Sequence, residues 1–429
     1  MTNKSPTFIG RLLGLFTGGS TETGKILRPD EVAAARQYIT DYWPKLLRHE
    51  TMDRDTLVGV PNPYLVAAYA PDHDFDFDEM YYWDTYFMAQ GFFGPNDQKF
   101  IEGLIDNQLF LLNRFGLVPN ATRTYQTGKS QPPFLTTLIF EFYDHYQPGS
   151  DWLKPRIEAA KQEYRDVWMA TRKPNARKVH HGLSRYYVPD MTHDQAEIES
   201  GWDYTPRFER RCLDFLPVDL NALLYKYETD FARAALIMGD VTEAGLWRRA
   251  ARRRRKTMTD LMWDRRRGLF YDYDYVNGRR GPISSLAAYY CMWSGLATKR
   301  QAKLMVKAMR RFEHAGGLTT TDDIPLNQRF LGGMPTQWAY PNGWAPLHYV
   351  VIGALERYGY KREARRVALK WLRTNLDWFG TNGVFLEKYN VVQIGAPPGK
   401  GVYPSQIGFG WTNAVFERLC REYVDPPSA

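Results

Sequence analysis

Features that mark several common protein classes are scarce in this chain of 429 residues. It contains only three cysteines, Cys212, Cys291 and Cys420, which lie far apart and lack the spacing of a metal site. They indicate a reducing compartment, or simply that no disulfide framework holds the fold. The eight histidines form no HxxxH pair. We therefore expect neither a metal site nor another cofactor.

Long apolar runs are missing as well. Residues 8–16 are apolar, but Arg11 interrupts them and no small-residue cleavage site follows, so a signal peptide is not expected. No run approaches the roughly 20 residues that a helix needs to cross a bilayer. The sequence therefore predicts a cytoplasmic protein without a membrane partner.

The motifs that bind phosphate or activate a serine are also absent. The chain contains neither a glycine-rich P-loop nor a G-x-S-x-G elbow. Its formal net charge of +8 is concentrated in two basic clusters, residues 248–256 and 265–267. Helical apolar periodicity around the first cluster predicts that most of it forms the solvated face of a helix. Nucleic-acid binding would also need stacking platforms or a known fold, so no such partner is expected and it remains the minor alternative.

The chain is rich in apolar and aromatic residues, at 44% and 15%, which supports a large core. Helical periodicity is expected over residues 30–48, 80–92, 98–115, 132–147, 151–170, 217–238, 241–263, 284–296, 298–312, 343–357, 361–376 and 408–422. About twelve helices in successive pairs would suit six inner and six outer helices, a double-layered α-barrel. No Pro/Ser linker divides the chain, so residues 26–429 are expected to form one domain after a flexible arm over residues 1–25.

Six connecting loops differ from ordinary turns because they are rich in Trp, Tyr, Asn and Gln and carry isolated carboxylates. They cover residues 73–84, 116–133, 182–208, 336–346, 382–390 and 401–413. In a toroid, rigid helices hold the loops of one rim over a central pit, and these loops supply the site. Aromatic faces stack on sugars, and amides and carboxylates bind pairs of hydroxyl groups. The loops therefore predict a carbohydrate site.

One of these loops places a carboxylate beside a tryptophan. Residues 199–208 read ESGWDYTPRF, in which Asp203 follows Trp202. A carboxyl group packed against indole is partly desolvated, which raises its pKa and keeps it protonated, as a general acid must be. The alternative is a surface aspartate that caps the following helix.

Five segments form a pattern together. They read YYWDTY at 81–86, GLVPNATRTYQTGKSQPP at 116–133, ESGWD at 199–203, QWAYPNGWAP at 337–346 and GFGWTN at 408–413. In this order they resemble the signature motifs of the trehalase family of glycoside hydrolases, and the resemblance covers about residues 60–424. It implies an (α/α)6 barrel, in agreement with the helix pattern. It also implies cleavage of an α-glucosidic bond with inversion at the anomeric carbon, by two carboxylates.

The resemblance gives a role to each of two carboxylates. Asp203 matches the family's general acid, and Glu387, in the segment LEKY, matches its general base. An inverting glycosidase needs a protonated and an ionised carboxyl group roughly 6.5–9.5 Å apart, and two carboxylates on separate rim loops are compatible with that spacing. Lys388 can keep the base ionised if its ammonium points inward. The alternative for Glu387 is a salt-bridged surface pair with Lys388.

The resemblance also implies a pocket for the glucose that is transferred. The matching residues are Phe77, Tyr81, Trp83, Asp84, Asn120, Gln131, Gly201 and Trp338. Asp84 is expected to bind a pair of hydroxyl groups, while Trp83 and Trp338 are expected to wall the sugar ring. The alternative for both tryptophans is a place in the core.

The chain departs from the family where the family contacts the second sugar. Asp76 and Lys129 replace arginines, Ala339 replaces an aspartate, Val402 replaces a glutamate, and the loop 188–198 lacks an Arg-Pro-Glu trio. The half of the site that cleaves is therefore expected to be intact, whereas the half that recognises the aglycone is altered.

Lys129 stays a candidate ligand of the second sugar. Arg185 and Arg207, together with Arg123, can replace the lost hydrogen bonds if their side chains turn toward that sugar. The leading hypothesis is an inverting hydrolase of α,α-trehalose. The alternatives are an enzyme for another small α-glucoside or glucosylated solute, and a non-catalytic sugar-binding protein. Because a binding protein needs no pair of opposed carboxyl groups, Asp203 and Glu387 favour an enzyme.

Overall fold

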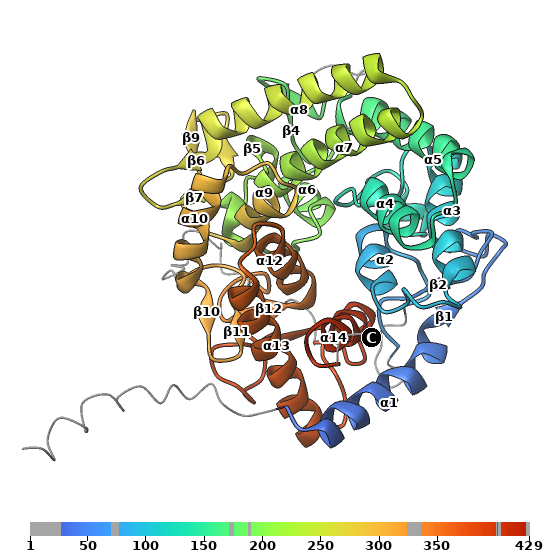
Figure 1. Cartoon of the computed structure of the whole chain (residues 1–429), viewed down its shortest axis with the longest axis vertical. Helices are drawn as coiled ribbons and strands as arrows, with labels where there is room; N and C mark the ends of the chain where they lie inside the picture. Colours follow the sequence, from blue (N-terminus) through green and yellow to red (C-terminus); the bar gives the residue numbers. More distant parts are fainter. Residues whose placement is uncertain are drawn as a thin grey trace, which may run out of the picture.

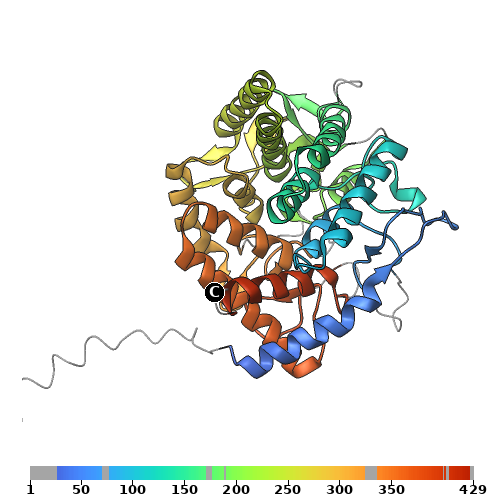
Figure 2. The ribbon, with the colours of Figure 1, turned by 45° about the vertical axis from the view of Figure 1, so that its right-hand side comes forward.

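Two concentric rings of helices surround one axis in the computed structural model (Figure 1). The structure describes residues 27–69, 77–170, 176–187, 190–323, 336–399, 401 and 405–425. Figure 2 shows that the first described helix lies along the outside of the last two, against which it packs. The chain therefore closes into a ring. This is the predicted all-α, (α/α)6 architecture, which is confirmed.

The inner ring consists of strongly buried helices. They are α2 (Tyr82–Ala89), α4 (Leu135–Tyr146), α7 (Val218–Ile237), α9 (Tyr290–Trp293), α12 (Ala345–Arg357) and α14 (Gly410–Tyr423). Every residue of α2 is buried. Helix α14 packs against both α2 and α12, so the end of the inner ring meets its beginning. Helices that are apolar on nearly all sides belong inside a core.

The outer ring consists of amphipathic helices. They are α1 (Pro29–Leu46), α3 (Gln98–Phe115), α5 (Ser150–Glu163), α8 (Val241–Met262), α10 (Lys299–Ala308) and α13 (Lys361–Asn382). Each places an apolar stripe toward the inner ring and leaves polar residues at the surface. Helix α8 packs along α7, and α13 packs along α12, as the pairing of successive helices predicts.

Short antiparallel strands join the helices. They are β1 (Leu47–Arg48), β2 (Tyr64–Leu65), β3 (Lys178–His180), β4 (Leu183–Ser184), β5 (Phe215–Leu216), β6 (Trp263–Asp264), β7 (Leu269–Phe270), β8 (Tyr273–Asp274), β9 (Arg279–Arg280), β10 (Glu313–His314), β11 (Gly317–Leu318), β12 (Asn342–Trp344) and β13 (Lys388–Asn390). The pairing of β12 with β13 sets Trp344 opposite Lys388 and Asn342 opposite Asn390. This ladder holds one side of the site.

Each predicted helix has a counterpart, and the differences lie at the ends. The segment 80–92 is helical only over α2, and 284–296 forms a 3₁₀ turn (Leu286–Tyr289) followed by α9. Helix α6 (His193–Glu199) was not predicted, because seven residues are too few to reveal a period. Its signal was a capping box, in which the Thr192 side chain accepts a hydrogen bond from the backbone N–H of Gln195.

Most of the basic cluster at 248–256 is the solvated face of α8, as predicted. Arg248, Arg252 and Arg253 are among its exposed residues. Arg254 is the exception: it is buried, and its guanidinium donates to Glu228 Oε1 at 2.9 Å. It falls on the inward face of the helix, where a carboxylate of α7 neutralises it.

The described part of the chain also bears on the features that the sequence lacks. Its three cysteines are buried and free. No helix among the described residues is long and apolar enough to span a bilayer. The same residues contain no cluster of histidine, cysteine and carboxylate side chains that would hold a metal ion.

Candidate functional site

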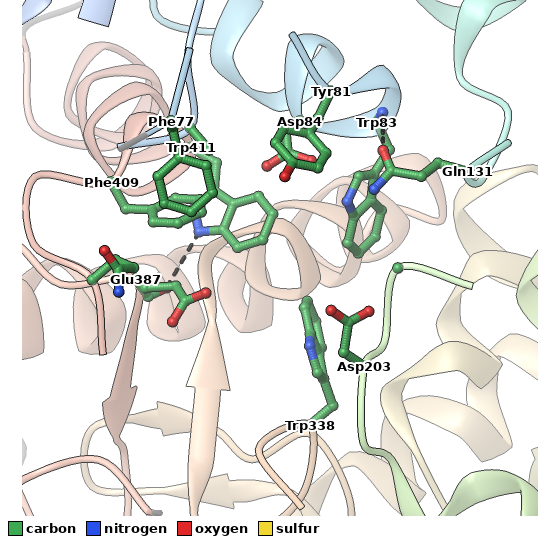
Figure 3. Close-up of a pocket in the computed structure, with 13 residues that line it drawn as sticks. Phe77, Tyr81, Trp83, Asp84, Gln131, Asp203, Trp338, Glu387, Phe409 and Trp411 are labelled. Atoms are coloured by element: carbon green, nitrogen blue, oxygen red, sulfur yellow. Dashed lines mark hydrogen bonds between the residues drawn. The ribbon is translucent and has the colours of Figure 1, made fainter. Parts of the chain in front are cut away.

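A cavity of about 390 Å³ lies where several inner helices begin. It is lined by Ala67, Phe77, Tyr81, Trp83, Asp84, Gln131, Gly201, Asp203, Trp338, Glu387, Gln406, Phe409 and Trp411. Six of these residues are aromatic and three carry carboxyl groups. Figure 3 shows the carboxyl groups of Asp203 and Glu387 on opposite sides of this space, with Asp84 on a third side.

The loop that carries Asp203 begins directly after α6 with a turn that only glycine suits. Gly201 has a φ of +72°, in the left-handed region. A Cβ atom at this position would lie 2.8 Å from the indole of Trp83. The glycine therefore allows the backbone of the loop to lie directly against a wall of the cavity.

Two buried glutamates hold this loop from behind. The Glu199 carboxylate accepts hydrogen bonds from both terminal nitrogens of Arg177, at 2.9 and 2.6 Å. It also accepts from the backbone N–H of Ser130 at 2.9 Å, which ties it to the loop 116–133. Glu197 accepts from the backbone N–H of Thr205 at 2.8 Å, and burial raises the pKa of Glu197 to about 8. Glu197 thus holds the backbone on one side of Asp203, and Glu199 anchors the start of the loop to Arg177 and to the loop 116–133.

The environment of Asp203 favours its protonated form. Burial raises the pKa of Asp203 from 3.8 to about 7, and the negative charge of Glu387 acts in the same direction. The charge of Lys129 and a hydrogen bond from the backbone oppose the shift. A carboxyl group with a pKa near neutrality can hold a proton and give it up at the same pH, as general acid catalysis requires.

Glu387 lies directly before β13 and contacts a cation. The ammonium of Lys388 donates to Glu387 Oε2 at 2.6 Å, and the side chains of both residues are almost wholly buried. The backbone N–H of Glu387 donates to the Gln406 carbonyl at 2.9 Å, and Trp411 Nε1 donates to the Glu387 carbonyl at 3.2 Å. The predicted inward ammonium is therefore present, and the alternative of a surface pair does not fit this burial.

Asp84 is a third carboxyl group of the cavity. It lies in the first turn of α2, and burial raises its pKa well above the usual value. The charges of Asp203 and Glu387 add to this shift. Three close carboxyl groups resist ionising together, which favours the protonated form. A protonated carboxyl group can donate a hydrogen bond to a sugar hydroxyl as well as accept one.

The tryptophans predicted to wall the sugar both line the cavity. Trp83 and Trp338 are 1% and 2% exposed, so each is part of the core. The same two side chains also form a wall of the cavity, so the core position does not exclude contact with a sugar. Trp338 stacks face to face on Trp344, with 3.8 Å between ring centroids and 2° between planes. Its other side stacks on Trp202 at 5.3 Å. Since indoles cover both faces of Trp338, it offers an edge to the cavity.

Of the five other residues predicted to bind the transferred glucose, four line the cavity together with the tryptophans. They are Phe77, Tyr81, Gln131 and Gly201. Asn120 instead lies behind the wall, where its amide donates to the Ser130 carbonyl at 3.1 Å and is buried. It supports the loop that presents Gln131 and does not face the cavity.

The basic residues predicted to bind the second sugar are separated by the fold. Lys129 lies near the acid: burial lowers the pKa of its ammonium, while the charges of Asp203 and Glu199 oppose this. Arg185 donates to the Leu213 carbonyl at 2.7 Å and to the Tyr275 hydroxyl at 2.8 Å. Its guanidinium is committed to these contacts outside the cavity lining.

Arg207 and Arg123 are also engaged elsewhere. Arg207 is 1% exposed and forms buried ion pairs with Asp219 and Asp272, each at 2.8 Å. Arg123 pairs with Glu79 at 2.9 Å. A guanidinium held by two buried carboxylates does not swing into a neighbouring pocket, so the structure corrects the expectation for Arg207. The departures at Asp76, Val402 and residues 188–189 lie outside the described residues.

Four residues of the cavity were not predicted from the sequence: Phe409, Trp411, Gln406 and Ala67. Phe409 and Trp411 stand in the GFGWTN segment, so the resemblance had already marked their neighbourhood. Gln406 comes from the loop before it, and the isolated pairing of Leu386 with Ile407 brings this loop beside Glu387. Ala67, which follows β2, carried no signal because a small apolar side chain is common everywhere.

Comparison with known proteins places these features in a family. The family model described as Trehalase matches residues 20–198 and 191–424. The chain is 34% identical over 422 residues to the cytosolic neutral trehalase of Emericella nidulans, with 79% of this chain and 56% of the relative covered. It is 31% identical over 436 residues to the cytosolic neutral trehalase of Saccharomyces cerevisiae, with 84% and 56% covered. The chain thus spans little more than half the length of these relatives.

Solved structures agree with the fold. A neutral trehalase from Saccharomyces cerevisiae superposes with a TM-score of 0.73 at 29% identity, over 85% of this chain and 74% of that one. A mannosylglycerate hydrolase from Thermus thermophilus, in complex with glucose, superposes with a TM-score of 0.66 at 18% identity, over 90% of this chain and all of that one. The second likeness shows the fold alone.

Proposed function

The chain belongs to the trehalase family, and from this premise we propose that it is an inverting glycoside hydrolase that cleaves α,α-trehalose into two glucose molecules. The proposal is supported by relatives named as neutral trehalases. It is also supported by a cavity of aromatic walls and carboxyl groups, which suits a sugar. We further infer a cytoplasmic location, since those relatives are named as cytosolic.

The observation that carries the proposal is the contrast between two carboxyl groups in one cavity. Asp203, with a pKa of about 7, serves as the general acid. Glu387, whose Oε2 accepts a hydrogen bond from the Lys388 ammonium, serves as the general base. Two carboxyl groups with different environments on opposite sides of a substrate are what an inverting glycosidase uses. A protein that only binds sugar has no use for this difference.

The proposed reaction proceeds in one displacement. Glu387 takes a proton from a water molecule, whose oxygen forms a bond to the anomeric carbon of the bound glucose. At the same time the bond from this carbon to the bridging oxygen breaks, and Asp203 gives its proton to that oxygen. The water enters from the face opposite the leaving group, so an α-glucoside releases β-glucose. Solvent then returns a proton to Asp203 and removes one from Glu387.

Anomer-resolved proton NMR during hydrolysis tests this scheme. Trehalose is expected to give β-glucose from the ring that is attacked and α-glucose from the ring that leaves, so the two anomers appear in equal amounts before mutarotation. An excess of α-glucose would indicate a covalent intermediate and retention, and would overturn the scheme. The wild-type chain is compared with the double variant Asp203→Asn/Glu387→Gln, which controls for contaminating glycosidases.

A second candidate function is hydrolysis of another small α-glucoside or glucosylated solute. It is favoured by the commitment of Arg185 and Arg207 to structural contacts, which leaves Lys129 as the predicted cationic ligand of the second sugar near the acid. Each lost charged hydrogen bond costs about 1.5–3 kcal/mol, so losing two weakens binding roughly 10²-fold or more.

A substrate screen separates the two candidates. If trehalose is the substrate, we expect it to be cleaved with a high KM, in the millimolar range or above. A sub-millimolar KM for trehalose would contradict the weakened second-sugar site. Turnover confined to a different α-glucoside would instead make the second candidate the function.

A further inference from the structure

Three tryptophans from two distant segments of the chain, residues 199–203 and 337–346, form a column beside the cavity, which we call the tryptophan stack (Trp202, Trp338 and Trp344). Trp338 lies in the middle, 3.8 Å from Trp344 and 5.3 Å from Trp202 between ring centroids. Trp202 and Trp344 are fully buried. In sequence Trp202 directly precedes Asp203, and Trp344 faces Lys388 across the β12–β13 ladder.

A cation lies at each end of the tryptophan stack. The Arg207 guanidinium lies 4.3 Å from the ring centre of Trp202, and the Lys388 ammonium lies 5.0 Å from that of Trp344. Both cations are themselves anchored, Arg207 by Asp219 and Asp272 and Lys388 by Glu387. Cations over the faces of desolvated indoles attract them, and stacked indoles attract one another, so the column is stable from end to end.

We propose that the tryptophan stack, with Lys388 at one end and Arg207 at the other, is a positioning device that fixes the separation of the Asp203 and Glu387 carboxyl groups. The residue beside each carboxyl group belongs to the column or to its capping cation. The carboxyl groups themselves stand on unrelated segments, a loop and the start of a strand. Without the column, the distance between them would depend on the relative motion of these two segments.

This inference rests on the proposed function, because only a reaction that uses both carboxyl groups is sensitive to their separation. A displacement of about 1 Å in a catalytic group can lower the rate as much as 10²-fold. Trp202 and Trp344 do not line the cavity, so they influence the reaction through Asp203 and Glu387. Trp338 stacks on both Trp202 and Trp344 and so connects them.

A double-mutant cycle on Trp202→Leu and Trp344→Leu tests the device. Each single variant is expected to lower kcat for trehalose about 10-fold with little change in KM, since the reacting groups move while the cavity lining stays. If the column acts as one unit, breaking it at either end has the same consequence, so the kcat of the double variant is also about 10-fold below wild type. If the two substitutions act independently, their free-energy effects add, and the kcat of the double variant falls about 100-fold.

Additive losses would therefore overturn the proposal, and so would single variants with wild-type kcat. Thermal unfolding establishes that each variant is folded. If a leucine variant does not fold, the cycle is run with Trp202→Phe and Trp344→Phe, whose smaller rings weaken the same contacts, and the same criterion applies. If the wild-type chain hydrolyses no α-glucoside, the proposed function fails and this inference falls with it; if it does, the cycle judges the inference alone.

Lys388, the cation that caps the tryptophan stack beside the general base Glu387, provides a second test. The Lys388 ammonium contacts Glu387 Oε2 at 2.6 Å and lies 5.0 Å from the ring centre of Trp344. Lys388→Met removes both contacts, so it should lower kcat for trehalose about 10-fold with little change in KM. Adding Trp202→Leu to Lys388→Met should lower kcat no further, because both substitutions break the same column.

A matched control exists on the outer ring. The Lys161 ammonium pairs with Glu243 Oε1 at 2.6 Å, and Trp247 Nε1 donates to the same oxygen at 2.9 Å. This second group of lysine, glutamate and tryptophan lies away from the cavity, and the Lys161 side chain is only 3% exposed. Lys161→Met should lower the thermal stability without lowering kcat. An equal loss of kcat in both lysine variants would contradict a local role for Lys388.

Discussion

The two sides of the cavity hold their carboxyl groups in opposite ways. On the acid side, Asp203 stands on a loop that two buried glutamates hold: Glu197 accepts from the backbone N–H of Thr205, and Glu199 binds the side chain of Arg177 and the backbone N–H of Ser130. On the base side, Glu387 immediately precedes a strand, and the β12–β13 ladder holds its backbone neighbour Lys388 opposite Trp344. The first arrangement depends on specific side chains, and the second on backbone pairing.

The charges around the two groups differ as well. Asp203 is shifted mainly by burial, and the charge of Lys129 only opposes this shift. Glu387 instead accepts a hydrogen bond from a buried ammonium. The comparison shows that the same functional group can be suited to giving a proton or to taking one, depending on whether a cation contacts it. Four predictions test this difference, beginning with the largest expected effect.

Asp203→Asn and Glu387→Gln should each lower turnover of trehalose by at least about 10²-fold, the low end of general acid–base contributions. The two variants should differ on α-glucosyl fluoride, whose leaving fluoride needs no proton. We expect the Asp203 variant to recover much of its activity on this substrate, while the Glu387 variant stays inactive because the water is still not activated. Steady-state kinetics on both substrates measure this.

The reverse pattern on α-glucosyl fluoride would exchange the roles of the two groups. Near wild-type turnover by either variant on every cleaved substrate would show that the pair is not catalytic. Circular dichroism of each variant controls for loss of the fold.

The same two substitutions should have opposite effects on stability. Glu387→Gln leaves the Lys388 ammonium without its carboxylate, which should cost about 3 kcal/mol, as for other broken buried pairs. Asp203 has a raised pKa, so the folded chain holds its proton more tightly than the unfolded chain does. Its contribution to stability is complete below about pH 4 and is lost as the pH rises through about 7.

Asp203→Asn removes this pH dependence. Its Tm relative to wild type should therefore rise by a few degrees between pH 4 and pH 8, whereas the Tm of Glu387→Gln should stay below wild type near neutral pH. Calorimetry across this range measures both differences. A pH-independent difference for Asp203→Asn would contradict the raised pKa.

Gly201→Ala tests how tightly the acid loop is held. The new residue would have a φ of +72° and a Cβ atom 2.8 Å from Trp83. The left-handed conformation alone costs about 1–2 kcal/mol. Gly359→Ala is the matched control, because Gly359 has a φ of +81° with no atom within 4 Å of the added Cβ. Urea unfolding and kcat compare the two.

We expect Gly201→Ala to lose about 1 kcal/mol more than Gly359→Ala, since only the former displaces an indole. It should also lower kcat, whereas Gly359→Ala should not. Equal losses of stability with unchanged kcat in both variants would show that the contact with Trp83 is unimportant.

Lys129→Met should produce the smallest effect. Because the charge of Lys129 lowers the pKa of Asp203, its removal should move the basic limb of the pH–rate profile upward by a fraction of a pH unit. Lys256→Met, at an exposed pair with Asp260 on α8, should leave the profile unchanged. A downward shift with Lys129→Met would mean that another group controls this limb.

The sequence by itself determined the fold and most of the cavity. Helical periodicity placed the segments that became the two rings, because amphipathic and fully apolar helices differ in the pattern of their side chains. The segments YYWDTY, ESGWD and LEKY marked Tyr81, Trp83, Asp84, Asp203 and Glu387, and all of these line the cavity. Such residues are recognisable because unusual loop composition and motif order are properties of the sequence alone.

Only the tertiary structure decided which side chains were available to a ligand. Arg207 was predicted to be a sugar ligand because it follows the ESGWD motif, but Asp219 on α7 and Asp272 before β8 hold its guanidinium against the ring of Trp202. Arg254 is likewise drawn inward by Glu228. The orientation of a charged side chain depends on partners brought close by folding, and the local sequence contains no record of them. For the same reason, the tryptophan stack that joins the acid and base sides could not be anticipated from two separate motifs, ESGWD and QWAYPNGWAP.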